Sequence, residues 1–163
     1  MNKMLLLAAS LILPIGIAHG ADPPEVKEGL WSIHSQTTDN PGNKKSETSS
    51  TICRSHAYDQ HVQSLAKKAA KDCTVKESFE GGKYIGESRC TVSGIVIETK
   101  GTSTFQGDTA THSETHTTYT PAFAGMTDST MTADQKYLGS CPAGVQPGDL
   151  TTSEGQVNHL WKH

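Results

Sequence analysis

The feature that most constrains the fold is a pair of adjacent glycines, at positions 81 and 82, between two strand-like segments that each end in a cysteine. Alternating residues on both sides of two glycines are the pattern of a β-hairpin closed by a two-residue turn. Such a turn places Cys73 opposite Cys90 at a non-hydrogen-bonded pair, where opposed Cα atoms lie within the span of a disulfide. The same count sets two further cross-strand pairs, Phe79 with Tyr84 on the cysteine face and Lys76 with Glu87 on the other. The segment therefore predicts a disulfide-bonded hairpin with one apolar and one polar face.

The remaining two cysteines predict a second, longer-range disulfide. An even number of cysteines in an exported chain indicates structural disulfides. If Cys73 pairs with Cys90, then Cys53 pairs with Cys141, and this bridge stabilises the fold by about 4 to 5 kcal/mol on the chain-entropy model. Pairing of Cys53 with Cys73 across the predicted helix stays open as an alternative. The spacings lack the short C-x-x-C clusters of zinc sites and redox centres.

The first 20 residues have the pattern of a secretory signal peptide: Lys3, an apolar run too short for a membrane span, and small residues before a cut. Cleavage is expected near Gly20 and Ala21. No cysteine stands at the cut to carry a lipid, so we expect an exported soluble protein with no membrane anchor.

Residues 21–163 have a length that suits one β-rich domain. The whole chain has 14 Lys and Arg against 17 Asp and Glu, and Lys3 is lost with the leader. The mature chain is therefore acidic, with scattered basic side chains. Nucleic acid is not expected as a partner, because phosphate binding needs clustered positive charge.

Alternating and turn-bounded segments predict about seven strands in an antiparallel meander, with one helix inserted after the second strand. The predicted strands are residues 29–35, 47–53, 73–80, 83–90, 91–104, 109–120 and 126–138. Ser55 can cap a helix over residues 56–71, whose apolar stripe is Tyr58, Val62, Leu65, Ala66 and Ala69. We expect Met126, Met131, Tyr137 and Leu138 in the core. The prediction is a mainly β fold, either a curved open sheet or a partial barrel, with a loop at residues 139–149 and an unassigned tail within residues 143–163.

Five short motifs together resemble one known family. They are Gly29-Leu30-Trp31, Thr51-Ile52-Cys53, the Cys73/Cys90 hairpin, Phe105-Gln106-Gly107-Asp108, and Tyr137-Leu138-Gly139-Ser140-Cys141-Pro142. The chain resembles the exported bacterial proteins of domain-of-unknown-function family 3617 over about residues 29–142. The resemblance implies a disulfide-stabilised β domain of the bacterial periplasm or exterior, and it carries over no catalytic residue.

The strongest candidate for chemistry is a strand segment with two histidines and a carboxylate. His112, Glu114 and His116 are two residues apart, so on a strand they share one face, and Zn²⁺ or Cu²⁺ accepts these ligand types. If Gly107 and Asp108 form a two-residue turn, the three residues lie opposite Ser103, Gly101 and Thr99 on a face shared with Ile95, Ile97 and Phe105. The two histidines would be roughly 13 Å apart on an extended strand, so one histidine with Glu114 is the more feasible unit.

No catalytic set is assembled in the sequence: it lacks a G-x-S-x-G motif and a glycine-rich phosphate loop. We therefore expect a non-enzymatic module, with no cofactor, that binds a small apolar or amphipathic ligand or a protein partner. The alternative is periplasmic binding of Zn or Cu through the His112, Glu114 and His116 strand.

Overall fold

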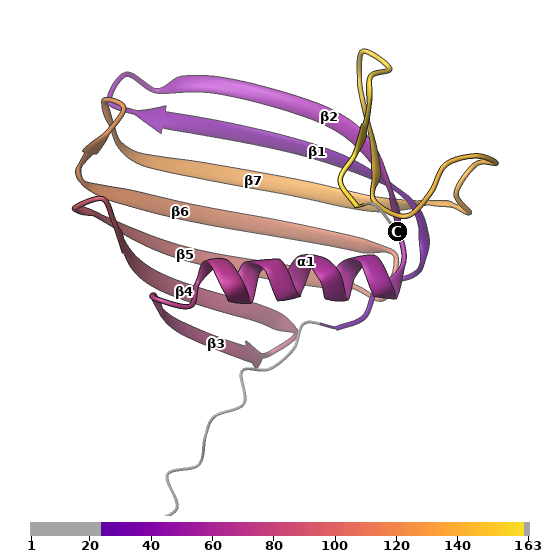
Figure 1. Cartoon of the computed structure of the whole chain (residues 1–163), viewed down its shortest axis with the longest axis horizontal. Coiled ribbons are helices and arrows are strands. Elements are labelled where there is room, and N and C mark those ends of the chain that lie inside the picture. The colour runs from indigo at the N-terminus through magenta and orange to yellow at the C-terminus, as the bar shows by residue number, and fades with distance from the viewer. Residues whose placement is uncertain (1–23, 162–163) are drawn as a thin grey trace, which may run out of the picture.

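The computed structural model describes residues 24–161, which form one nine-stranded antiparallel sheet and one helix (Figure 1). The predicted signal peptide lies outside the described residues. In chain order the elements are β1 (Gly29–Asn40), β2 (Lys44–Arg54), α1 (His56–Ala69), β3 (Thr74–Glu80), β4 (Lys83–Val92), β5 (Ile95–Gln106), β6 (Ala110–Phe123), β7 (Met126–Gly139), β8 (Asp149–Thr152) and β9 (Val157–His159). In space the strands follow the order β3-β4-β5-β6-β7-β1-β2-β8-β9.

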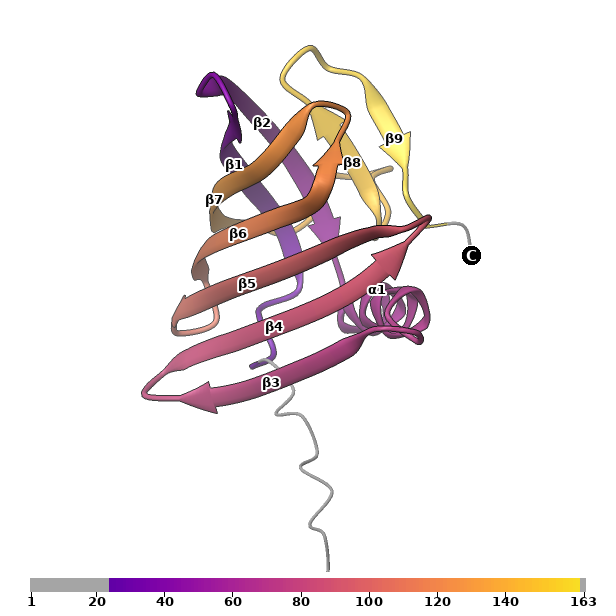
Figure 2. The same ribbon diagram turned by 90° about the vertical axis from the view of Figure 1, so that its left-hand side faces the viewer.

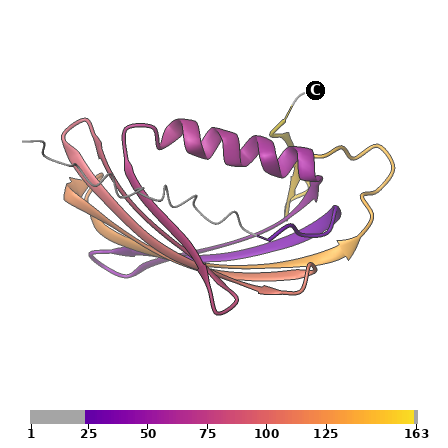
Figure 3. The ribbon, with the colours of Figure 1, turned by 90° about the horizontal axis from the view of Figure 1, so that it is seen from below.

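The sheet is open and curved, with β3 at one edge and β9 at the other (Figure 2). Helix α1 lies across its hollow side (Figure 3). We call the side that faces α1 the concave face and the opposite side the convex face. Because side chains alternate along a strand, each strand contributes to both faces.

The mainly β fold with a helix after the second strand is confirmed, but the number of strands is nine rather than seven. The two additional strands come from the C-terminal segment: β8 pairs with β2, and β9 pairs with β8. They are four and three residues long. Strands of this length are too short to show an alternating pattern in the sequence.

The hairpin at positions 81 and 82 has the predicted register. Both glycines have positive φ, as a tight hairpin turn requires, and Phe79 faces Tyr84 across it. Cys73 is bonded to Cys90 with the two Cα atoms 4.4 Å apart. A second disulfide joins Cys53 at the end of β2 to Cys141, which follows β7, with a Cα separation of 5.7 Å.

The buried core is small and lies at one end of the concave face. Its buried members are Val26, Trp31, Ile52 and Tyr58, and Ile33, Phe105, Tyr137, Leu150 and Trp161 pack against them. Gly29 is required beside this core, because a Cβ there would lie 2.3 Å from the carbonyl oxygen of Gly139. Because the core occupies only one end of the concave face, the remainder of that face lies outside it.

Two residues of β7 that the sequence assigns to the core are exposed instead: Met131 is 40% and Leu138 is 55% exposed. Leu138 follows Tyr137, which packs against the core, so alternation points Leu138 away from it. Met131 lies between Thr37 and Thr115 on the concave face, where neither neighbour offers an apolar surface.

Candidate functional site

The histidine strand singled out in the sequence lies on β6 and faces the convex side of the sheet. His112 Nδ1 lies 2.8 Å from Asp134 Oδ1, and His112 Nε2 lies 3.4 Å from Glu114 Oε1. The hydrogen bond to Asp134, followed by the bond to Glu114, raises the pKa of His112. His116 Nε2 lies 3.6 Å from Asp128 Oδ1. Each histidine therefore lies beside a different set of carboxylates: Asp134 and Glu114 for His112, and Asp128 for His116.

The predicted register between β5 and β6 is wrong by one residue. The turn contains three residues, 107–109, rather than two, because Gln106 pairs with Ala110. His112 consequently faces Thr104, and Glu114 faces Thr102. A one-residue shift moves a strand's side chains to the other face, so the histidines point away from the side of Ile97 and Phe105.

The structure does not gather the three candidate ligands: His112 lies beside Glu114 and Asp134, whereas His116 lies beside Asp128. Across residues 24–161, no three His, Cys, Asp or Glu side chains lie close enough together to hold a metal ion. Both ring nitrogens of His112 already face carboxylate oxygens.

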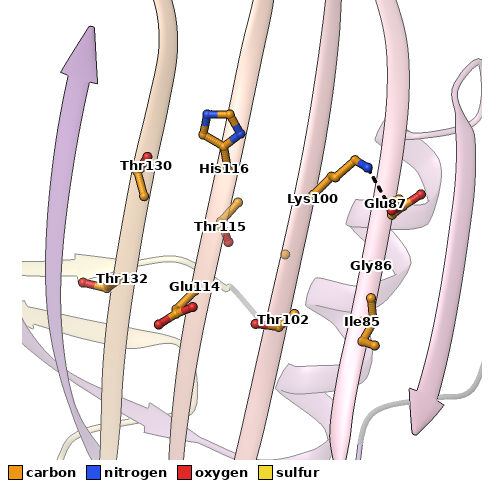
Figure 4. A pocket seen from close by; sticks show the side chains of 11 residues that line it. Ile85, Gly86, Glu87, Lys100, Thr102, Glu114, Thr115, His116, Thr130 and Thr132 are labelled. Carbon is orange, nitrogen blue, oxygen red and sulfur yellow. Dashed lines mark ion pairs between the residues drawn. The ribbon is translucent and has the colours of Figure 1, made fainter.

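A shallow hollow of about 540 Å³ lies on the convex face beside this strand (Figure 4). Its walls are two cross-strand rows, Glu87, Lys100, His116 and Thr130 in one, and Ile85, Thr102, Glu114 and Thr132 in the other. Lys100 Nζ lies 3.3 Å from Glu87 Oε1, so part of the charge is paired within the hollow. These exposed, mutually paired polar groups are typical of the solvated face of an antiparallel sheet.

A deeper feature lies on the concave face, between α1 and the edge of the sheet. A cavity of about 660 Å³ separates the second half of the helix from β3 and β4. Its lining residues are Ala66, Lys67 and Ala70 from the helical side, and Cys73, Val75, Lys76, Glu77 and Ser88 from the sheet side. The volume is in the range of pockets that hold small molecules.

A smaller concavity, which we call the second hollow, has a volume of about 260 Å³ and continues this cavity over the concave face of β4, β5 and β6. The two share Val75, Glu77 and Ser88. The second hollow adds Tyr84, Gly86, Thr99, Gly101, Ser103 and Thr115. We call the two hollows together the helix–sheet groove.

The apolar stripe of α1 lies next to the helical residues that line this groove, and much of it is exposed. Of the residues of α1, all of which the structure describes, Tyr58 alone is buried. Val62 is 43% and Leu65 is 48% exposed. On a helical wheel both lie between His61, which stacks on Trp161, and Ala66, which lines the cavity. The stripe therefore borders the cavity on the side of Ala66, with about half of the Val62 and Leu65 side chains exposed.

The helix is held in this position at both ends. At its start, Ser55 caps α1 by accepting a hydrogen bond from the Tyr58 N–H at 3.2 Å, and Arg54 Nε lies 3.0 Å from Asp59 Oδ1. At its end, the Cys73 N–H donates to the Ala70 carbonyl at 2.9 Å, and the disulfide then ties this segment to β4. The groove is thus preformed by the covalent and hydrogen-bonded structure.

Comparison with protein families matches residues 26–141 to the model described as "Protein of unknown function (DUF3617)". The chain belongs to this family. The matched DUF3617 segment contains α1, the first seven strands, all four cysteines and every residue that lines the helix–sheet groove. Strands β8 and β9 follow it. No curated protein shows significant similarity to the chain.

Sequence reasoning identified the apolar stripe of the helix but did not identify the residues that line the groove. The signal that could have revealed it is the composition of the opposing strands of the DUF3617 segment. Thr99, Ser103 and Thr115 share the concave face, so this part of the sheet offers less apolar surface to the helical stripe than a packed core would. Gly101, which the sequence predicts opposite Glu114, lies opposite Thr115 instead, and a Cβ there would lie 3.3 Å from Thr115 Oγ1.

Proposed function

We propose that this protein is a non-enzymatic binding module that holds a small amphipathic ligand in the helix–sheet groove. The observation that supports this most strongly is a cavity of about 660 Å³ beside the exposed apolar stripe of α1. Apolar residues scattered singly on a surface need no explanation, but exposed apolar side chains at the margin of a concavity are characteristic of binding sites.

The energetics favour an occupant. Covering the exposed halves of Val62 and Leu65 with apolar ligand atoms would contribute on the order of 2 kcal/mol, because full burial of each such side chain is worth about 1.5–3 kcal/mol. Since both ends of α1 are fixed, little of this gain is lost in ordering the protein.

We further propose that the protein works outside the cytosol, in the periplasm or as a secreted protein. Two disulfides suit an oxidising compartment. Within residues 24–161, no helix combines the length and apolar character that crossing a membrane requires.

Charged substitutions in the stripe test the proposed function. N-phenyl-1-naphthylamine, an uncharged fluorescent probe of apolar sites, is expected to bind the wild-type protein saturably. The double variant Val62→Glu/Leu65→Glu is expected to bind it about tenfold or more weakly, because carboxylates replace the apolar contacts. Its thermal unfolding midpoint should stay close to that of the wild type, since both side chains are already exposed.

The matched control is Gln60→Glu/Ser64→Glu, which adds the same charge on exposed positions of the opposite helical face. This variant should bind the probe like the wild type. Equal affinities for all three proteins, or a wild type that does not bind at all, would refute the proposed function.

A further inference from the structure

The sheet side of the groove is lined by hydroxyl groups. Thr99, Ser103 and Thr115 line it directly, and neighbouring hydroxyls on β6 pair with two of them. Ser103 Oγ lies 2.8 Å from Ser113 Oγ, and Thr99 Oγ1 lies 3.2 Å from Thr117 Oγ1. A hydroxyl carries one hydrogen and two lone pairs, so each pair uses one hydrogen and keeps the capacity both to donate and to accept. A ligand group that can both donate and accept hydrogen bonds is therefore the best complement to this hydroxyl-lined side of the groove, which we call the hydroxyl wall.

Two glycines form an open floor in the same hollow. Gly86 on β4 lies directly opposite Gly101 on β5. A Cβ at Gly86 would meet nothing within 4 Å, and one at Gly101 would meet Thr115 Oγ1 at 3.3 Å. Both residues, which lie within the described chain, have ordinary strand backbone rather than positive φ. Glycine weakens the interior of a strand, and neither the backbone conformation nor close packing requires it at Gly86. We therefore take the role of the glycine pair to be the room that it leaves for a ligand above the sheet.

The charge of this hollow disfavours an acidic ligand. Among the described residues that line the second hollow, none is Lys or Arg, and the charged ones are Glu77 and Glu87. Glu87 pairs with Lys100. The Glu77 carboxylate can accept hydrogen bonds from hydroxyl groups, whereas it would repel a carboxylate or phosphate.

From these observations, and resting on the proposed function, we infer that the ligand is an uncharged amphiphile whose head carries several hydroxyl groups, as in a glycolipid. Its head lies over Gly86 and Gly101 against the hydroxyl wall. Its apolar tail extends into the larger cavity, along Ala66, Ala70 and Val75 and toward the exposed stripe of Val62 and Leu65. The shared lining residues Val75 and Ser88 make the two parts one continuous site.

Displacement of N-phenyl-1-naphthylamine by amphiphiles with tails of seven or eight carbons tests this inference. Octyl glucoside, octanoate and octyltrimethylammonium, each kept below its micelle concentration, differ chiefly in the charge and hydroxyl groups of the head. Octyl glucoside is expected to displace the probe at about tenfold lower concentration than either charged amphiphile. Glucose alone should displace little, because it lacks the tail.

Two sets of variants locate the head. Gly86→Val fills the floor with a strand-favouring side chain, and Thr99→Val/Thr115→Val removes hydroxyls at nearly constant shape. The advantage of octyl glucoside is the ratio between the displacing concentrations of the charged amphiphiles and its own. Both variants are expected to reduce this ratio to below about threefold, while probe affinity stays within about twofold of the wild type. Thr130→Val/Thr132→Val on the convex face serves as the control and should leave the advantage unchanged.

Equal displacement by the three heads, or stronger displacement by octanoate or octyltrimethylammonium, would overturn the inference and leave the proposed function standing, since the probe would still bind. An advantage for octyl glucoside that the control variant loses as fully as Gly86→Val would also overturn it. Absence of saturable probe binding to the wild type would contradict both proposals.

Discussion

Replacing Trp31 by alanine is expected to lower the free energy of unfolding by about 3–5 kcal/mol, as large-to-small changes of buried aromatic residues do. Trp31 is 0% exposed and lies at the centre of the core. Its Nε1–H donates to the Lys27 carbonyl at 2.8 Å, its ring meets Tyr137 edge-on at 6.0 Å, and the Arg54 guanidinium stands 5.2 Å from it. Since the buried core is small, no second cluster compensates for its loss within the described residues.

Urea denaturation followed by far-UV circular dichroism measures this change without relying on tryptophan fluorescence. The control is Phe123→Ala, an aromatic truncation at a site that is 48% exposed, for which a loss below about 1 kcal/mol is expected. A loss of the same small size for Trp31→Ala would show that the core is not where we place it.

Removing the long-range disulfide with Cys53→Ser/Cys141→Ser is expected to cost about 4–5 kcal/mol, because the bridge closes a segment with a sequence separation of 88. Cys53 is 1% exposed, so the substitution also places a serine hydroxyl in a buried site. Cys73→Ser/Cys90→Ser opens a separation of only 17, and the same model gives about 3 kcal/mol.

The two double variants are best compared by urea denaturation under non-reducing conditions. The expected order is wild type, then the hairpin variant, then the long-range variant as the least stable. A long-range variant as stable as the wild type would contradict the view that the link between the end of β2 and the segment after β7 stabilises the fold.

The parts of the fold that sequence predicted well depend on short-range geometry. The turn at Gly81 and Gly82 sets the pairing of Phe79 with Tyr84, and Ser55 alone marks the start of α1. A tight turn fixes the register of the two strands that it joins, and with it the cross-strand partner of each residue. A capping residue satisfies N–H groups of the first helical turn whatever the helix packs against.

The parts that failed depend on what a residue meets across space. Gly107 and Asp108 permit either a two-residue or a three-residue turn, and this choice decides which face of the sheet receives His112. Similarly, the spacing of Val62 and Leu65 predicts an amphipathic helix correctly. Periodicity contains no information about whether the sheet surface near the helix is apolar, and here much of that surface carries hydroxyl groups.

The location of a bound amphiphile tests the central claim, that the groove under α1 is the binding site, most directly. Octyl glucoside titrated into ¹⁵N-labelled protein is expected to shift the amide resonances of groove residues such as Ala66, Val75, Ser88 and Gly101 the most. Amides at the far edge of the convex hollow, such as Thr130 and Thr132, should shift little. Shifts concentrated around the convex hollow, or no saturable shifts at all, would contradict the account.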